Sequence, residues 1–210
     1  MTLDEIGRLS GGRVMGDYLN TLITGISTDS RQAKAGDLFV ALVGENSDGH
    51  DYVEKAIDKG ASAAMVHANW YNTFLPTHGQ FIVVDYSDRP GCDSPLLALG
   101  QLGENYRKRF DIPVVGITGS MGKTSTREIL GTILRSRMNP LVSKANFNTE
   151  IGVPITLMDL TDANDVAVLE MAMRGLGQIE YLCKIAQPTA AIITNVGLSH
   201  IELLKTQDRT

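Results

Sequence analysis

Residues 112–125, with the sequence IPVVGITGSMGKTS, decide the fold of the second half of this chain. The apolar start of this stretch, residues 112–117, predicts a short buried strand of a parallel sheet. A glycine-rich turn follows, and a helix is expected at residues 123–137. A strand, a glycine-rich turn and a helix that opens on Gly-Lys-Thr are together typical of a phosphate-binding loop.

The residue types of this loop suit the binding of a nucleotide. Glycines allow backbone N–H groups to close around phosphate oxygens, and the helix N-terminus adds its dipole. Lys123 is expected to reach the β- and γ-phosphates, and the Thr124 hydroxyl to complete a Mg²⁺ shell. The common spacing would place a glycine at Ile117, whereas Gly116 and Gly119 lie on either side of it. A chance glycine-rich turn would leave Gly-Lys-Thr at the helix start unexplained.

Two further apolar runs, residues 165–170 and 189–195, lie on either side of a helical stretch at residues 177–186. This alternation predicts an α/β unit with a parallel sheet that is covered on both faces. The carboxyl ends of parallel strands meet at one edge of a sheet. We therefore expect Glu170 and His200, which end or follow these runs, on the same rim as the loop.

Glu170 and His200 are candidate metal ligands. An acid at a strand end is more often a surface residue, but the loop upstream makes Glu170 a predicted Mg²⁺ ligand or water holder. A lone histidine is more often structural or solvated, and spacing leaves open whether His200 is a second metal ligand or a phosphate contact. The predicted nucleotide-binding residues are Gly119, Ser120, Met121, Gly122, Lys123, Thr124, Ser125 and Asn195.

The first part of the chain also reads as α/β. After a short initial helix, the pattern predicts extended segments at residues 25–30 and 37–43 and a helix at 52–59. Two strands are expected at 61–66 and 80–85. The polar stretch 85–94 is a predicted linker into a helix at residues 95–110. We therefore expect two domains, residues 1–90 and 91–210.

Composition excludes several classes of protein. A formal charge of −5 and a pI near 5.3 argue against nucleic-acid binding, and residues 107–109 (Arg-Lys-Arg) are interpreted as a solvated helix end. Cys92 and Cys183 are too few and too far apart for a disulfide framework or a zinc site. No apolar run approaches the roughly 18 residues that cross a bilayer, so we expect a cytoplasmic protein without a membrane partner.

Three polar clusters remain ambiguous on first principles. Asn146, Asn148 and Thr149 precede an apolar segment, where a helix cap formed by Asn148 or Thr149 is as plausible as a binding role. Residues 27–31 (STDSR) and 44–50 (GENSDGH) are rich in hydrogen-bonding side chains beside glycines, and each could be an ordinary turn.

Taken together, these stretches resemble the Mur ligases, and the likeness runs over the whole chain. It is carried by STDSR at 27–31, GDLFVAL at 36–42, DGHDY at 48–52, TGSMGKTS at 118–125 and NFNTEIGVP at 146–154. The first three are shared with the ligases that add the third peptide residue. The last leans towards those that add D-Ala-D-Ala.

The resemblance implies an ATP-dependent amide ligase of peptidoglycan synthesis, with ATP and Mg²⁺ as cofactors. ATP would phosphorylate the terminal carboxylate of UDP-N-acetylmuramoyl-tripeptide, and the amine of D-Ala-D-Ala would attack the acyl phosphate. A small N-terminal α/β substrate domain would precede a P-loop-type ATP-binding domain with a parallel sheet. The implied catalytic residues are Lys123, Glu170 and His200; the metal ligands Thr124, Glu170 and His200; and the substrate contacts Ser30, Arg31, Asn46, Asn146, Asn148 and Thr149.

The chain departs from the family in length. The family's ligases are much longer, with a C-terminal domain that helps to bind ATP and the incoming amine, and with a carbamylated lysine whose expected place lies beyond Thr210. Lys205 is too close to His200 to take that role. We therefore expect a fragment that binds its ligands weakly and does not turn over alone.

Two alternatives remain open from the sequence. One is a related ligase, which adds the third peptide residue or makes polyglutamate or cyanophycin. The other is a non-catalytic module that binds ATP tightly and has no affinity for a UDP-sugar. A purely structural role would leave the Gly-Lys-Thr loop unexplained.

Overall fold

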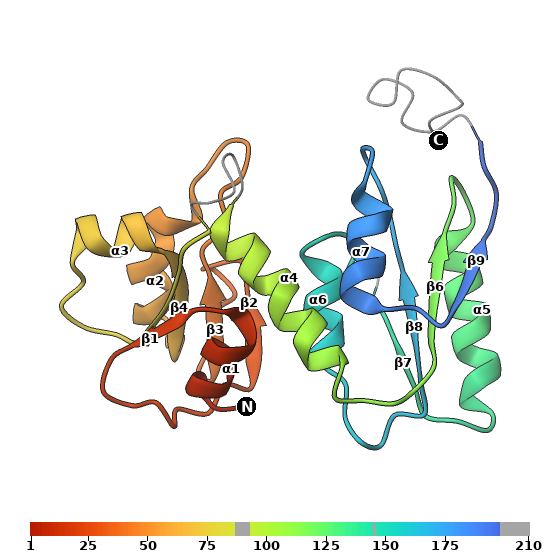
Figure 1. The fold of residues 1–210 in the computed structure, drawn as a ribbon, viewed down its shortest axis with the longest axis horizontal. Coiled ribbons are helices and arrows are strands. Elements are labelled where there is room, and N and C mark those ends of the chain that lie inside the picture. The colour runs from red at the N-terminus through yellow and green to blue at the C-terminus, as the bar shows by residue number, and fades with distance from the viewer. Residues whose placement is uncertain (87–92, 145, 198–210) are drawn as a thin grey trace. The chain divides into compact units, whose positions relative to one another are not determined.

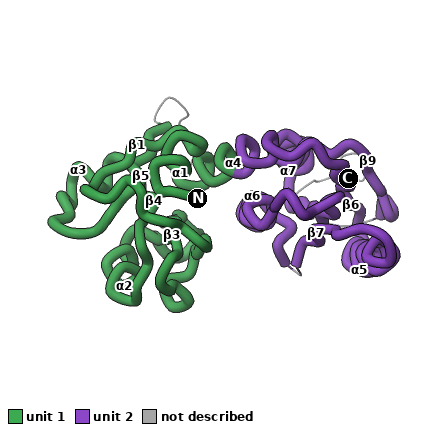
Figure 2. The backbone as a smooth tube through the Cα atoms, turned by 90° about the horizontal axis from the view of Figure 1, so that it is seen from below, with its two compact units in different colours: residues 1–102 green, residues 103–210 purple. Residues whose placement is uncertain are grey.

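The computed structural model describes residues 1–86, 93–144 and 146–197 (Figure 1). It divides into two compact units, Met1–Leu102 and Gly103–Thr210, so that the boundary falls inside helix α4 (Ser94–Arg107) (Figure 2). Within the described ranges, no helix combines the length and the apolar character that a bilayer span requires.

A five-stranded sheet with the order β1-β5-β4-β3-β2 forms the centre of the first unit. Its strands are parallel except for β1, which pairs antiparallel with β5. The strands are β1 (Arg13–Met15), β2 (Gly25–Ser27), β3 (Asp37–Val40), β4 (Ala63–His67) and β5 (Phe81–Val84). The helices are α1 (Leu3–Ser10), the 3₁₀ turn η1 (Gly49–Tyr52), α2 (Val53–Asp58) and α3 (Ala68–Phe74).

The central strands of this sheet are largely apolar and buried, apart from the buried Asp37 at the start of β3 and His67 at the end of β4. All four residues of β3 and of β5 are buried, and Trp70 and Tyr71 of α3 pack against the core on one face. The predicted helix at residues 52–59 and the strands at 61–66 and 80–85 are confirmed within a few residues. Strand β1 and helix α3 were not predicted, since neither carries a long periodic pattern.

The second unit contains a fully parallel sheet with the order β7-β8-β6-β9. Helix α5 packs on one face, and α6 and α7 cover the other (Figure 1). The predicted α/β class with a parallel sheet is confirmed. The elements are β6 (Val114–Thr118), α5 (Lys123–Arg135), β7 (Pro140–Val142), α6 (Gly152–Leu157), β8 (Val166–Glu170), α7 (Gln178–Ala186) and β9 (Ala190–Ile193).

Strand register sets the position of the phosphate-type loop. Ile117 of β6 lies opposite Glu170 on β8, and Thr118 lies opposite Ile193 on β9. The three strands therefore end at the same edge of the sheet. The loop after β6 emerges between the carboxyl ends of β8 and β9, as predicted for neighbouring parallel strands.

Arg107 corrects the interpretation of residues 107–109 as a solvated helix end. Its side chain is buried, and its guanidinium donates hydrogen bonds to the carbonyls of Ala186 (3.2 Å), Ile112 (2.9 Å) and Phe110. Lys108 and Arg109 are exposed, as expected. Ala186 is the last residue of α7, where helix carbonyls lack intrahelical donors, so Arg107 satisfies oxygens that would otherwise be left unpaired.

Replacing Arg107 with Met is expected to lower the free energy of unfolding by about 3 kcal/mol, because three carbonyl oxygens lose their donor. Urea unfolding followed by circular dichroism measures this change. Lys108→Met is the matched control at the exposed neighbour and is expected to cost less than about 0.5 kcal/mol. Equal effects of the two substitutions would contradict the structural role of Arg107.

Candidate functional site

The loop between β6 and α5 depends on glycine at two positions. Gly119 has φ +136°, and a Cβ atom there would lie 2.1 Å from Thr194 Oγ1 and 2.9 Å from the carbonyl oxygen of Asn195. Gly122 has φ +79° and is the N-cap of α5. Residues other than glycine rarely adopt either backbone conformation, and at Gly119 there is also no space for a side chain.

Residues that follow β9 hold this loop from one side. The backbone N–H of Ser120 donates to the Asn195 carbonyl (3.1 Å), and that of Met121 to Asn195 Oδ1 (2.8 Å). The Thr194 hydroxyl donates to the carbonyls of Met121 and Thr118. The structure therefore brings Asn195 together with residues 119–122 and uses it as a support for the loop backbone.

The N-terminus of α5 is suited to an anion. Gly122 offers no side-chain cap, and the first N–H groups of a helix have no partner within the helix. Lys123 lies in the first turn, and its ammonium group folds back across the loop to donate to the Gly119 carbonyl. Thr124 and Ser125 complete the first turn. The N–H groups of a helix N-terminus, the helix dipole and a lysine are together the features of a phosphate-binding cradle.

Glu170, at the carboxyl end of β8, collects several of the polar groups at this rim. Its side chain is 4% exposed. Carboxylate Oε2 accepts hydrogen bonds from Thr124 Oγ1 (3.0 Å) and Arg127 Nη1 (3.2 Å), and Oε1 accepts one from Asn148 Nδ2 (2.9 Å). The Glu170 backbone N–H donates to Ser143 Oγ (3.0 Å). Hydrogen bonds to both oxygens fix the orientation of the carboxylate.

Thr124 and Glu170 together offer what a hard cation requires. The hydroxyl that donates to Glu170 keeps its lone pairs available, and a carboxylate is a preferred ligand of Mg²⁺. The predicted third ligand, His200, lies outside the described residues.

Sequence reasoning missed Arg127 and Ser143. The signal for Arg127 was its position three residues after Thr124, which places both on one face of α5.

The segment 146–150 approaches Glu170 through Asn148. Asn146 has a left-handed backbone with φ +70°, which asparagine tolerates better than most residues. The alternative that Asn148 or Thr149 caps the next helix is wrong, because Ile151 is the N-cap of α6 and no side chain caps it. The Asn148 amide reaches the carboxylate of Glu170 instead, and the carbonyl of Thr149 accepts a hydrogen bond from Val153 N–H.

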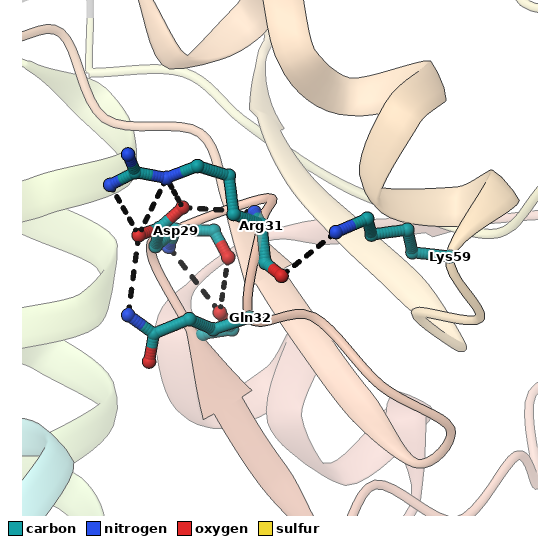
Figure 3. Close-up of polar contacts among 5 residues, drawn as sticks. Asp29, Arg31, Gln32 and Lys59 are labelled. Carbon is teal, nitrogen blue, oxygen red and sulfur yellow. Dashed lines mark hydrogen bonds and ion pairs between the residues drawn. The ribbon is translucent and has the colours of Figure 1, made fainter.

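In the first unit, Arg31 lies just beyond β2. Its guanidinium folds back onto the Asp29 carboxylate, with Nη2 2.8 Å from Oδ2 and Nε 3.0 Å from Oδ1 (Figure 3). Hydrogen bonds from Arg31 hold the pKa of the Asp29 carboxyl well below its usual range, so the pair stays charged at neutral pH. Lys59 Nζ donates to the Arg31 carbonyl (2.9 Å). These contacts hold both the side chain and the backbone carbonyl of Arg31 in place.

The other predicted substrate residues of this unit lie close to the ends of β2 and β3. Ser30 is buried just beyond β2, and Asn46 is exposed in a bend that follows β3. Because β2 and β3 are parallel neighbours, both loops emerge at the same edge of the sheet. The structure therefore places Ser30, Arg31 and Asn46 at one rim.

Two family models match the chain. Residues 22–106 match the Mur ligase family, catalytic domain, and residues 117–210 match the Mur ligase middle domain. The chain belongs to the Mur ligase family. Its resemblance to that family, first seen in the glycine-rich loop and the polar clusters, is confirmed.

Named relatives of this Mur ligase chain include the UDP-N-acetylmuramoyl-tripeptide–D-alanyl-D-alanine ligase of Synechocystis, which is 44% identical over 182 residues (87% of this chain, 38% of the relative). A crystal structure of MurF from Acinetobacter baumannii is 34% identical, with a TM-score of 0.84 over 99% of this chain and 43% of that chain. MurF from Thermotoga maritima in complex with ADP is 33% identical, with a TM-score of 0.75 over 93% of this chain and 42% of that one. The Mur ligase chain thus spans about two fifths of the length of these relatives.

Gly119→Ala is expected to lower the free energy of unfolding by about 1–3 kcal/mol, because the new methyl group meets Thr194 at a strained backbone position. Gly175→Ala is the control, since nothing lies within 4 Å of a Cβ atom there. Its cost is expected to stay within about 0.5 kcal/mol. Chemical denaturation of both variants measures the difference, and an unaffected Gly119→Ala protein would refute the tight approach.

Proposed function

We propose that this chain is the part of an ATP-dependent UDP-N-acetylmuramoyl-tripeptide–D-alanyl-D-alanine ligase that binds the UDP-linked precursor and the phosphates of ATP. The observation that carries the proposal is the 3.0 Å contact between the Thr124 hydroxyl and the Glu170 carboxylate beside the glycine loop. A hydroxyl and a carboxylate side by side at this rim support a Mg²⁺–nucleotide site. Relatives that bear the ligase name, at 31–44% identity, support the substrate assignment.

The residues of the loop fit Mg²⁺ and a nucleotide. Thr124 and Glu170 would hold the metal ion through hard oxygen atoms, and His200 is proposed as a further ligand. Gly119 and Gly122 keep side chains out of the space beside the N-terminus of α5. Bound Mg²⁺ would supply positive charge to the phosphate oxygens during phosphoryl transfer.

The start of α5 and Lys123 then have defined tasks. The N–H groups at the start of α5 hold phosphate oxygens, and Lys123 turns from the Gly119 carbonyl to the β- and γ-phosphates. The terminal carboxylate of the precursor attacks the γ-phosphorus, and ADP leaves. The amine of D-Ala-D-Ala then attacks the acyl carbon, phosphate leaves with the electrons of the broken C–O bond, and the amine nitrogen loses a proton to solvent. Lys123 stabilises the charge that develops on the transferred group.

The UDP-sugar is assigned to the rim of the first unit, where Ser30, Arg31 and Asn46 follow neighbouring strands. Arg31 offers a guanidinium that suits a diphosphate. Asn146, Asn148 and Thr149 are assigned to substrate in the second unit, and Asn148 also orients Glu170 through its amide. ATP and a UDP-linked precursor as substrates suit the cytoplasm, which is the proposed location.

Lys123→Met is expected to weaken Mg·ATP binding at least about tenfold, because the cradle loses its point charge. Binding of UDP-N-acetylmuramoyl-tripeptide should not change. Calorimetric titration of the chain with each ligand tests both statements, with the exposed Lys184→Met as the matched control. Tight ATP binding without any affinity for the UDP-precursor would instead support a non-catalytic ATP module.

Arg31→Gln is expected to weaken binding of the UDP-precursor about tenfold, since the diphosphate loses a cation and meets the freed Asp29 carboxylate. Mg·ATP binding should stay the same. Arg8→Gln provides the control, because Arg8 is also exposed and paired with an aspartate, at 3.2 Å from Asp4. An unchanged affinity of Arg31→Gln for the UDP-precursor would remove Arg31 from the site.

A further inference from the structure

Arg127 is a buried cation for which sequence patterns gave no role. Its side chain is 2% exposed and ranks among the largest fully buried side chains. It projects from α5 towards the end of β8, where Nη1 lies 3.2 Å from Glu170 Oε2. Burial of a guanidinium costs free energy that a single ion pair seldom repays in full. A buried arginine at this place therefore calls for a reason beyond stability.

Arg127 contacts the same carboxylate oxygen of Glu170 that Thr124, in the first turn of α5, also contacts. Glu170 Oε2 accepts hydrogen bonds both from Arg127 and from Thr124, the residue proposed to bind Mg²⁺. The second guanidinium contact goes to Glu128 Oε1 (2.6 Å), whose side chain is 58% exposed. Solvent screens that outer carboxylate, so most of the charge of Arg127 acts on Glu170.

The third guanidinium nitrogen of Arg127, Nε, supports an electrostatic role for this side chain over a packing role. Arg127 Nε is buried and has no hydrogen-bond partner within the described ranges. In a purely structural role each guanidinium nitrogen is expected to have a partner, as in Arg107, where each nitrogen donates to one carbonyl. The side chain instead carries a fixed positive charge to Glu170.

We propose that Arg127 is a positioning residue that neutralises Glu170, so that the site takes up a divalent cation together with a nucleotide and not alone. This inference rests on the proposed Mg²⁺–nucleotide function of the loop. A free dication gains little from a carboxylate that is already paired with a guanidinium. The polyphosphate of ATP brings the negative charge that makes the site attractive to the metal ion again.

Coulomb's law sets the size of the effect. A dication about 5 Å from a guanidinium is repelled, even at the dielectric constant of water, enough to weaken its binding about tenfold. Burial of Arg127 and Glu170 lowers the local dielectric constant and strengthens this repulsion. Removal of the positive charge from Arg127 should therefore raise the affinity of the nucleotide-free site for divalent cations by at least about tenfold.

The test measures Mn²⁺ binding to the nucleotide-free chain by electron paramagnetic resonance, with Mn²⁺ as the probe for Mg²⁺. Arg127→Met is expected to bind Mn²⁺ at least about tenfold more tightly than the wild type. Its melting temperature should rise on addition of Mg²⁺ alone, which the wild type should not show. Arg127→Lys keeps the charge and should behave like the wild type. The exposed Arg135→Met, on the same helix, is the matched control.

Arg127→Met leaves a buried carboxylate unpaired and can lose its fold for that reason. The double variant Arg127→Met/Glu170→Gln removes both charges, and it should fold and lose the Mn²⁺ response. The wild type gives a second test that needs no change at Arg127. Tight Mn²⁺ binding by the nucleotide-free wild type that disappears in Glu170→Gln would overturn the proposal.

The outcomes separate this inference from the function on which it rests. If Mg·ATP binds in a Lys123-dependent manner but Arg127→Met and the wild type bind Mn²⁺ equally, only the role of Arg127 fails. If the chain does not bind Mg·ATP at all, the proposed function fails and this inference fails with it. Tighter Mn²⁺ binding by Arg127→Met, with Arg127→Lys like the wild type, supports both.

Discussion

The buried carboxylate of Glu170 is the group on which the geometry of the second unit's rim depends. A carboxylate with so little exposure is tolerated only with hydrogen-bond donors and a compensating charge. Thr124 and Arg127 provide them from α5 at one carboxylate oxygen, and Asn148 provides another at the second oxygen. The requirement of one buried charge thus fixes both α5, the helix that follows the loop, and the polar segment before α6.

The free-energy cost of burying a charge also explains why the ion pairs at the edges of the two sheets differ. In the first unit, the Asp29–Arg31 pair is open to solvent, so it costs little to form and can exchange partners easily. In the second unit, the Glu170–Arg127 pair is enclosed and its members cannot separate without leaving a buried charge. A solvent-exposed pair suits a surface that receives a ligand, while an enclosed pair suits a fixed framework.

Sequence reasoning identified the elements whose patterns are strong and local. The apolar runs at β6, β8 and β9 and the Gly-Lys-Thr turn led to the family and the fold class, and strand-end logic led to Glu170. The strands β1 and β7 were missed because three residues hold too little periodicity, and α6 was left as one alternative, the helix that Asn148 or Thr149 would cap. Arg107 and Arg127 were missed for another reason: hydropathy assigns arginine to the surface, and only the tertiary structure shows which carbonyls or carboxylates surround it.

The supports of the glycine loop have a consequence for the order of folding. Met121 and its partner Asn195 are 74 residues apart in the chain, and Ser120 is linked to Gly197 over 77. Contacts between such distant segments require a large loss of chain entropy and generally form late. The loop backbone should therefore reach its final shape only after β9 has docked beside β6. During synthesis, the helix α5 can form well before the cradle at its own N-terminus exists.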